Sequence, residues 1–156
     1  MKIKRLCSAP APAWAALLVL SAATVSDARA EERVLAGRLR CAALPALGGA
    51  GPLDAPFRLT LDGPRATYSR PLDGASARRS GAAERGEGGA APGGAVALRG
   101  AGAGPDWSFT ARYAGSLRPD GSGRLEGEQT WTIGGGRPVA RSCEVLFGSE
   151  VRTLVR

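Results

Sequence analysis

The sequence contains no histidine, and its only lysines, Lys2 and Lys4, lie at the amino terminus. Without histidine or a free cysteine, the usual pairs of nucleophile and base cannot be assembled, and a metal pair would lack further ligands. The glycine runs are not followed by Lys-Ser or Lys-Thr, so they predict no phosphate-binding loop. No basic cluster is interleaved with aromatic residues in the way that binds nucleic acid. We therefore expect no catalytic site, no metal, no cofactor and no nucleic-acid partner.

The first thirty residues have the three parts of a secretory leader. Basic residues at positions 2, 4 and 5 precede an apolar run over 13–25, and Ala28-Arg29-Ala30 follows it. The run is shorter than the roughly 20 residues that a helix needs to cross a membrane. Cys7 lies before the run, whereas a lipoprotein anchor needs a cysteine after it. We expect cleavage after Ala30 and a mature protein, 31–156, that is periplasmic or extracellular and has no transmembrane span.

Removing this leader changes the charge. The 21 basic residues become 17 through loss of Lys2, Lys4, Arg5 and Arg29, and the 14 acidic residues become 13 through loss of Asp27. The net charge falls from +7 to +4, and every remaining basic residue is arginine. A mild positive charge favours anionic surfaces such as lipid or polysaccharide headgroups, although solubility alone also explains it.

The mature sequence keeps two cysteines, Cys41 near its start and Cys143 near its end. In the oxidising compartment that export implies, an isolated pair usually forms a disulfide. The bridge would close a loop of 102 residues. The chain-entropy model predicts that such a loop stabilises the folded state by about 4–5 kcal/mol.

Apolar and polar residues alternate with a period of two through most of 31–156, which predicts half-buried strands. The clearest strand starts at Trp107 and places Phe109 and Tyr113 on the same face. Turn signals such as Asp62-Gly63 separate the strands. The segment 75–93 is weak, because alanine, glycine and arginine dominate it; it is either a floppy insertion or contains an edge-like strand over 82–87. The strands are expected at about 33–41, 56–61, 65–70, 82–87, 94–99, from 107 onward, 123–133 and 138–147.

The two cysteines decide between all-β architectures. A disulfide needs Cα atoms about 4.4–6.8 Å apart, so the first and last strands should be neighbours. A meander whose ends meet is an antiparallel up-and-down barrel, and closure requires an even number of strands. Counting 82–87 as a strand gives eight, and the predicted fold is a single barrel domain over 31–156. The alternative is a two-sheet β-sandwich.

Four aromatic residues share the predicted interior: Trp107, Phe109, Tyr113 and Trp131. They could line a ligand cavity, as small barrels can hold one small molecule, but core packing is the favoured interpretation. The polar residues Gln129 and Arg141 share this interior. They would either bind a ligand headgroup or, as favoured, lie at a barrel mouth with Arg141 stacked on Trp131.

Glu126 and Glu128 are two apart on one strand, a spacing that could suit paired carboxylates in a glycosidase. Their face is predicted to point outward beside Arg124, which favours a solvated surface.

The strings Trp107 to Gly115, Leu125 to Trp131 and Arg141-Ser-Cys143 resemble a pattern in small uncharacterised exported β-barrel proteins of Gram-negative bacteria. The resemblance covers about the last third of the chain and implies no assigned activity. The predicted architecture is also similar to that of periplasmic inhibitors of lysozyme, which are small disulfide-tied barrels. The inhibitory loop motif of that family is not recognisable here, so its function is not carried over.

Two functional hypotheses follow. The first is an exported, non-enzymatic binding protein with a small or amphipathic ligand in the barrel, contacting Trp107, Tyr113, Gln129, Trp131 and Arg141. The second is a protein-interaction or inhibitor-type envelope factor that acts through loops 42–55 and 71–93. It predicts that deleting 75–92 leaves folding intact but abolishes the pull-down of a partner.

Overall fold

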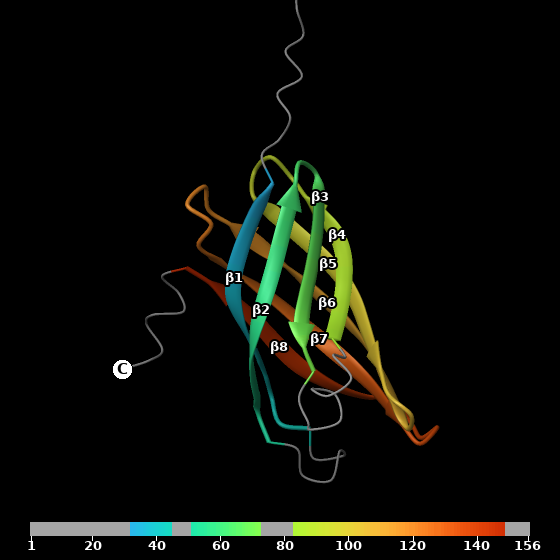
Figure 1. Ribbon diagram of the computed structural model, residues 1–156. Coiled ribbons are helices and arrows are strands. Elements are labelled where there is room, and N and C mark those ends of the chain that lie inside the picture. Colours follow the sequence, from blue (N-terminus) through green and yellow to red (C-terminus); the bar gives the residue numbers. More distant parts are fainter. Residues whose placement is uncertain (1–31, 45–50, 73–82, 149–156) are drawn as a thin grey trace, which may run out of the picture.

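The computed structural model describes residues 32–44, 51–72 and 83–148 (Figure 1). Within them the chain forms eight strands and no helix, so the described part offers no helix that could cross a membrane. The predicted leader over 1–30 lies outside the described residues. The strands are β1 (Arg33–Cys41), β2 (Leu53–Asp62), β3 (Arg65–Pro71), β4 (Ala83–Ala90), β5 (Ala95–Ala103), β6 (Trp107–Leu117), β7 (Gly123–Ile133) and β8 (Val139–Phe147).

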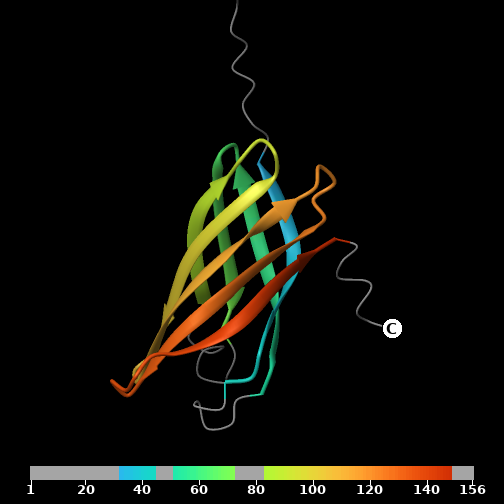
Figure 2. The ribbon, with the colours of Figure 1, turned by 180° about the vertical axis from the view of Figure 1, so that it is seen from behind.

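The eight strands form a closed antiparallel barrel in simple sequence order. Figures 1 and 2 show the tilted strands from opposite sides, with β1 to β4 in front in the first view and β7 and β8 in front in the second. Each strand pairs with the next, and β8 returns to pair with β1. The predicted up-and-down barrel is therefore confirmed, and the two-sheet sandwich is wrong.

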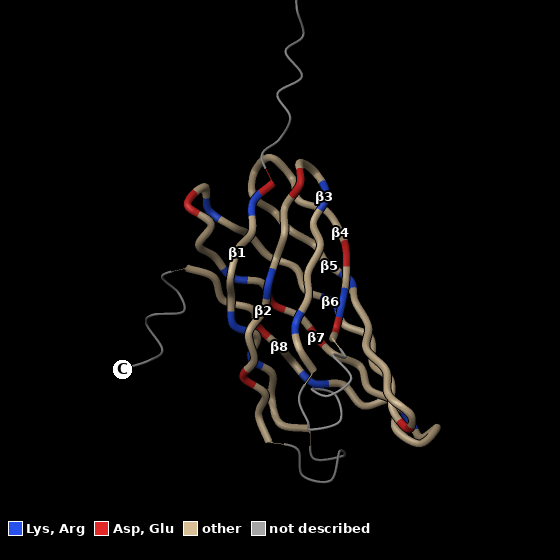
Figure 3. Tube along the Cα trace, in the orientation of Figure 1, with Lys and Arg blue, Asp and Glu red and all other residues tan. Residues whose placement is uncertain are grey.

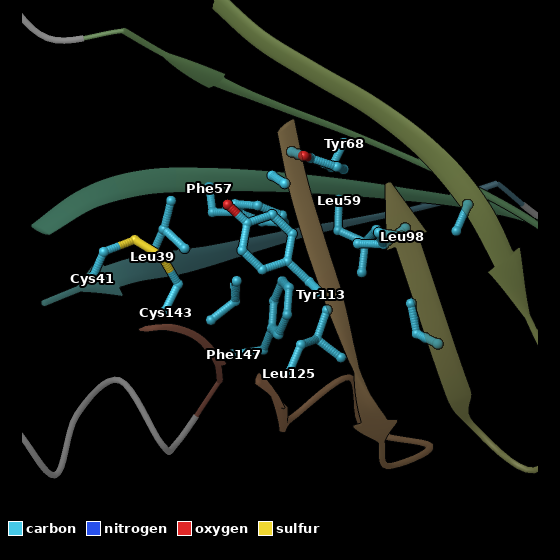
Figure 4. Close-up of a cluster of buried hydrophobic side chains, with 14 of the residues drawn as sticks. Leu39, Cys41, Phe57, Leu59, Tyr68, Leu98, Tyr113, Leu125, Cys143 and Phe147 are labelled. Carbon is cyan, nitrogen blue, oxygen red and sulfur yellow. A yellow bond between two sulfur atoms is a disulfide. The ribbon is translucent and has the colours of Figure 1, made fainter. Parts of the chain in front are cut away.

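The disulfide lies on the seam where the barrel closes. Cys41 of β1 is directly opposite Cys143 of β8, their Cα atoms are 4.0 Å apart, and both side chains face the interior. Figure 4 shows the bridge beside Leu39 in the apolar interior. The predicted link between the first and last strands is confirmed.

Replacing both cysteines, Cys41→Ala with Cys143→Ala, should lower the free energy of unfolding by about 3 kcal/mol, because measured losses usually fall below the chain-entropy figure. Urea unfolding monitored by circular dichroism measures this loss. A variant as stable as the parent protein would show that the hydrogen bonds between β1 and β8 close the barrel by themselves.

The weak segment of the sequence contains a full barrel strand. Strand β4 runs three residues beyond the expected 82–87, and it pairs with β3 on one side and β5 on the other. It is neither an insertion nor an edge. Deleting 75–92 would remove β4 and its pairing with both neighbours, so we now expect this deletion to prevent folding. Of the candidate loops, 71–93 is mostly strand where it is described, whereas only 53–55 of the described part of 42–55 belong to a strand. Residues 45–50 and 73–82 lie outside the described residues.

Glycine on the inner face of β4 and β5 makes room for a large ring from β3. Tyr68, Gly86 and Gly100 follow one another across the three strands in register. A Cβ atom at Gly86 would lie 2.1 Å from the Tyr68 ring, and one at Gly100 would lie 1.9 Å from its hydroxyl oxygen. The two glycines therefore leave space on the inner face of β4 and β5, and the Tyr68 side chain fills that space.

The two ends of the barrel differ. Short turns connect β2 to β3, β4 to β5 and β6 to β7 at one end, where the interior is filled by aliphatic side chains such as Leu59, Leu98 and Leu125. At the opposite end, Trp107 begins β6 and Trp131 lies two residues before the end of β7. We call this the tryptophan end.

Candidate functional site

A buried polar cluster lies inside the barrel on the side of the tryptophan end. Four of its members come from two strand pairs in direct register, because Arg70 of β3 is opposite Glu84 of β4 and Gln129 of β7 is opposite Arg141 of β8. None of these four side chains is more than 8% exposed. The Glu84 cluster consists of Tyr68, Arg70, Glu84, Tyr113, Gln129 and Arg141.

Glu84 is the acceptor at the centre of this cluster. Its Oε1 atom accepts hydrogen bonds from the hydroxyl groups of Tyr68, at 2.7 Å, and Tyr113, at 3.0 Å. Its Oε2 atom accepts from Arg70 Nε at 2.5 Å and from Gln129 Nε2 at 3.1 Å. A carboxylate that is fully buried is stable only when it is paired and hydrogen-bonded in this way.

Gln129 connects Glu84 to the tryptophan end. Its Nε2 atom also donates to the Tyr113 hydroxyl at 2.9 Å. Its Oε1 atom accepts from Arg141 Nε at 3.0 Å, from Arg141 Nη2 at 2.7 Å and from Trp131 Nε1 at 3.3 Å. The amide therefore fixes the position of both the guanidinium group and the indole ring.

Aromatic rings cover this polar cluster at the tryptophan end. Trp131 stacks on Phe109 with ring centroids 4.3 Å apart and contacts Trp107 at 5.5 Å. The Arg141 guanidinium carbon lies 5.3 Å from the Trp131 centroid, and that of Arg70 lies 5.9 Å from the Phe109 centroid. Both indole rings are partly exposed, whereas Phe109 is buried.

Burial raises the pKa of Tyr68 and of Tyr113 far above the usual value for a phenol. The second cause is the negative charge of Glu84, which also accepts a hydrogen bond from each hydroxyl group. Both phenols therefore stay protonated and act as donors throughout the physiological pH range.

The structure joins most of the residues that the sequence singles out. Tyr113, Gln129, Trp131 and Arg141 form one hydrogen-bonded chain, and Trp107 contacts it through its ring. The expected stacking of Arg141 on Trp131 is present. Placing Gln129 at the mouth was wrong, because its side chain is fully buried inside the barrel.

Sequence reasoning missed Tyr68, Arg70 and Glu84 as members of this cluster. The sequence pattern could have identified Tyr68 and Arg70. These two residues follow Ala66 at a period of two, so all three share the inward face of one strand. Glu84 lies among glycine and alanine residues, which weaken the alternation of apolar and polar residues that would predict a strand. The carboxylates of Glu126 and Glu128 are exposed, as expected.

The hydrogen bonds of the Glu84 cluster fix the positions of its side chains. No buried side-chain nitrogen or oxygen among the described residues lacks a hydrogen-bond partner. The same part of the chain contains no group of three or more histidine, cysteine, aspartate or glutamate side chains that could hold a metal. At the tryptophan end, two partly exposed indole rings lie beside the buried guanidinium group of Arg141.

The sequence matches no protein-family model, and no curated protein or solved structure is significantly similar to it.

Proposed function

We propose that the mature protein, residues 31–156, is an exported, non-enzymatic binding protein that takes a small amphipathic ligand at the tryptophan end. The observation that carries this proposal is the group formed by Trp107, Trp131 and Arg141. Partly exposed indole rings offer apolar area with little loss of side-chain freedom, and the guanidinium group beside them suits an anionic head.

Preorganisation supports the same proposal. Arg141 is held by two hydrogen bonds to Gln129, and Trp131 is held by a third to the same amide oxygen. A binding group whose rotamer is already fixed loses less entropy when the ligand arrives. We therefore attribute the buried cluster to the support of this binding end and not to chemistry of its own.

Export is the second part of the proposal and has separate support. The leader pattern over 1–30 and a disulfide across the barrel seam agree, because structural disulfides persist in oxidising compartments. A mass of 31–156, less about 2 Da for the oxidised cysteine pair, would test both features on protein recovered from the cell envelope.

Intrinsic fluorescence tests the binding end directly, since Trp107 and Trp131 are the only tryptophans in 31–156. We expect dodecanoate, below its micelle concentration, to shift their emission with saturation. Arg141→Met should weaken this binding about tenfold or more, as expected for a lost charge-assisted hydrogen bond.

The matched controls are Arg112→Met, which alters an exposed arginine on the outer face, and dodecanol, which lacks the anionic head. Arg112→Met should bind dodecanoate like the parent protein. Dodecanol should bind the parent protein and Arg141→Met with equal affinity. A parent protein whose tryptophan emission does not respond to dodecanoate would exclude a site for anionic amphiphiles at this end.

A further inference from the structure

The outer surface of β2 to β5 carries a hollow of about 1120 Å³, away from the two indole rings. Arginine, serine and threonine side chains predominate among the polar residues that line it on this face. Figure 3 shows basic positions on β2 and β4, on either side of β3. The residues used below are Arg58, Thr60, Thr67, Ser69, Arg85 and Arg99, and we call them the arginine groove.

Strand register places a hydroxyl group between two of the arginines. Arg58 of β2 is opposite Ser69 of β3, and Ser69 is opposite Arg85 of β4. Residues in one such row point to the same face of the sheet, and neighbouring strands are about 4.8 Å apart. The two arginine Cα atoms are therefore about 10 Å apart, with the serine hydroxyl between them. An anion above Ser69 lies within reach of both guanidinium groups.

The next row adds further polar groups on the same face. Thr60, Thr67, Glu87 and Arg99 follow one another across β2, β3, β4 and β5. The carboxylate of Glu87 is 3.6 Å from Arg65, which lies outside the groove. The second row therefore gives the groove one more guanidinium group and two hydroxyl groups next to the first anion position, together with the exposed carboxylate of Glu87.

Within the part of the chain that the structure describes, the arginines of the groove have no acidic partner. Across 32–44, 51–72 and 83–148, no carboxylate oxygen lies within 4.0 Å of Arg58, Arg85 or Arg99, and all three are exposed. Elsewhere on the outer surface, arginines such as Arg38 and Arg124 pair with carboxylates at 2.9–3.2 Å. Among the described residues, no carboxylate therefore neutralises the charge of these three guanidinium groups.

We propose that the arginine groove binds a phosphomonoester carried on a polar, sugar-like group. Arg58 and Arg85 hold the phosphate from two sides, because the guanidinium fork matches phosphate oxygens in pairs. The Ser69 hydroxyl group donates from below. The hydroxyl groups of Thr60 and Thr67 meet the sugar-like part, for which the volume of the groove leaves room. Because strands and not loops carry these groups, their backbone positions are fixed before the ligand binds.

Calorimetric titration with glucose 1-phosphate, and co-sedimentation with phosphatidylcholine vesicles with and without phosphatidic acid, test this site. Arg58→Gln with Arg85→Gln should weaken binding about tenfold or more. The matched control, Arg33→Gln with Arg137→Gln, removes two exposed charges outside the groove and should change affinity by less than about twofold. Thermal melts verify that each variant is folded.

The outcomes separate the sources of the phosphate. Binding of glucose 1-phosphate supports a soluble ligand, and binding of only the vesicles that contain phosphatidic acid supports a lipid headgroup. Equal losses in the two double variants would overturn the site in favour of general charge attraction. Equal affinity for glucuronate would overturn the choice of phosphate, and the absence of binding to both probes would overturn the proposal.

Discussion

Replacing Glu84 by alanine should lower the free energy of unfolding by about 3–5 kcal/mol, the range for breaking a buried ion pair from one side. The substitution leaves Arg70, which is 2% exposed, as a buried charge without its carboxylate. It also removes the shared acceptor of the Tyr68 and Tyr113 hydroxyl groups. Urea unfolding of 31–156 followed by circular dichroism measures the loss.

Two further variants show whether the uncompensated charge causes this loss. Glu87→Ala, on the same strand, removes an exposed carboxylate and should change stability by no more than about 0.5 kcal/mol. Glu84→Leu combined with Arg70→Met removes both charges and should be less damaging than Glu84→Ala alone. If Glu84→Ala is no worse than Glu87→Ala, the cluster does not stabilise the barrel.

The barrel should lose stability steeply above pH 10, where unfolded tyrosine ionises. Tyr68 and Tyr113 are the only tyrosines, and their pKa values are raised by burial in the folded state. Above pH 10 the unfolded chain therefore binds fewer protons than the folded one, so stability is complete below pH 10 and falls as the pH rises. Two such groups give a limiting slope of about 2.7 kcal/mol per pH unit.

This alkaline transition is unusually simple to assign because residues 31–156 contain no lysine, and arginine does not titrate below pH 12. Absorbance at 295 nm should stay low in the folded protein and rise only together with the loss of the circular dichroism signal. Tyr68→Phe should reduce the slope by about half. Gradual titration of both phenols in protein that remains folded would contradict their burial.

The architecture followed from few residues. The alternation that starts at Trp107 defined β6, and the positions of Cys41 and Cys143 required neighbouring end strands. These signals are local in sequence or impose a direct distance limit. They did not define β4, because its inner face carries Gly86 and Gly88, which offer no apolar side chain to the pattern.

The candidate site was predictable only in part, for a related reason. Gln129 and Arg141 stood out as polar residues on an apolar face, so the pattern found them. Glu84 stood among small residues, and its pairing with Arg70 depends on the register of β3 and β4. Register between two weakly patterned strands follows from packing around the whole barrel, which no single segment encodes.

The position of the disulfide also determines how the protein would respond to tension. A pull on the two ends of the described chain enters through β1 and β8 and meets the covalent link between Cys41 and Cys143. While that link is intact, the load passes from one end to the other without entering the chain between the two cysteines. Strands β2 to β7, with the Glu84 cluster and the arginine groove, are therefore shielded from force.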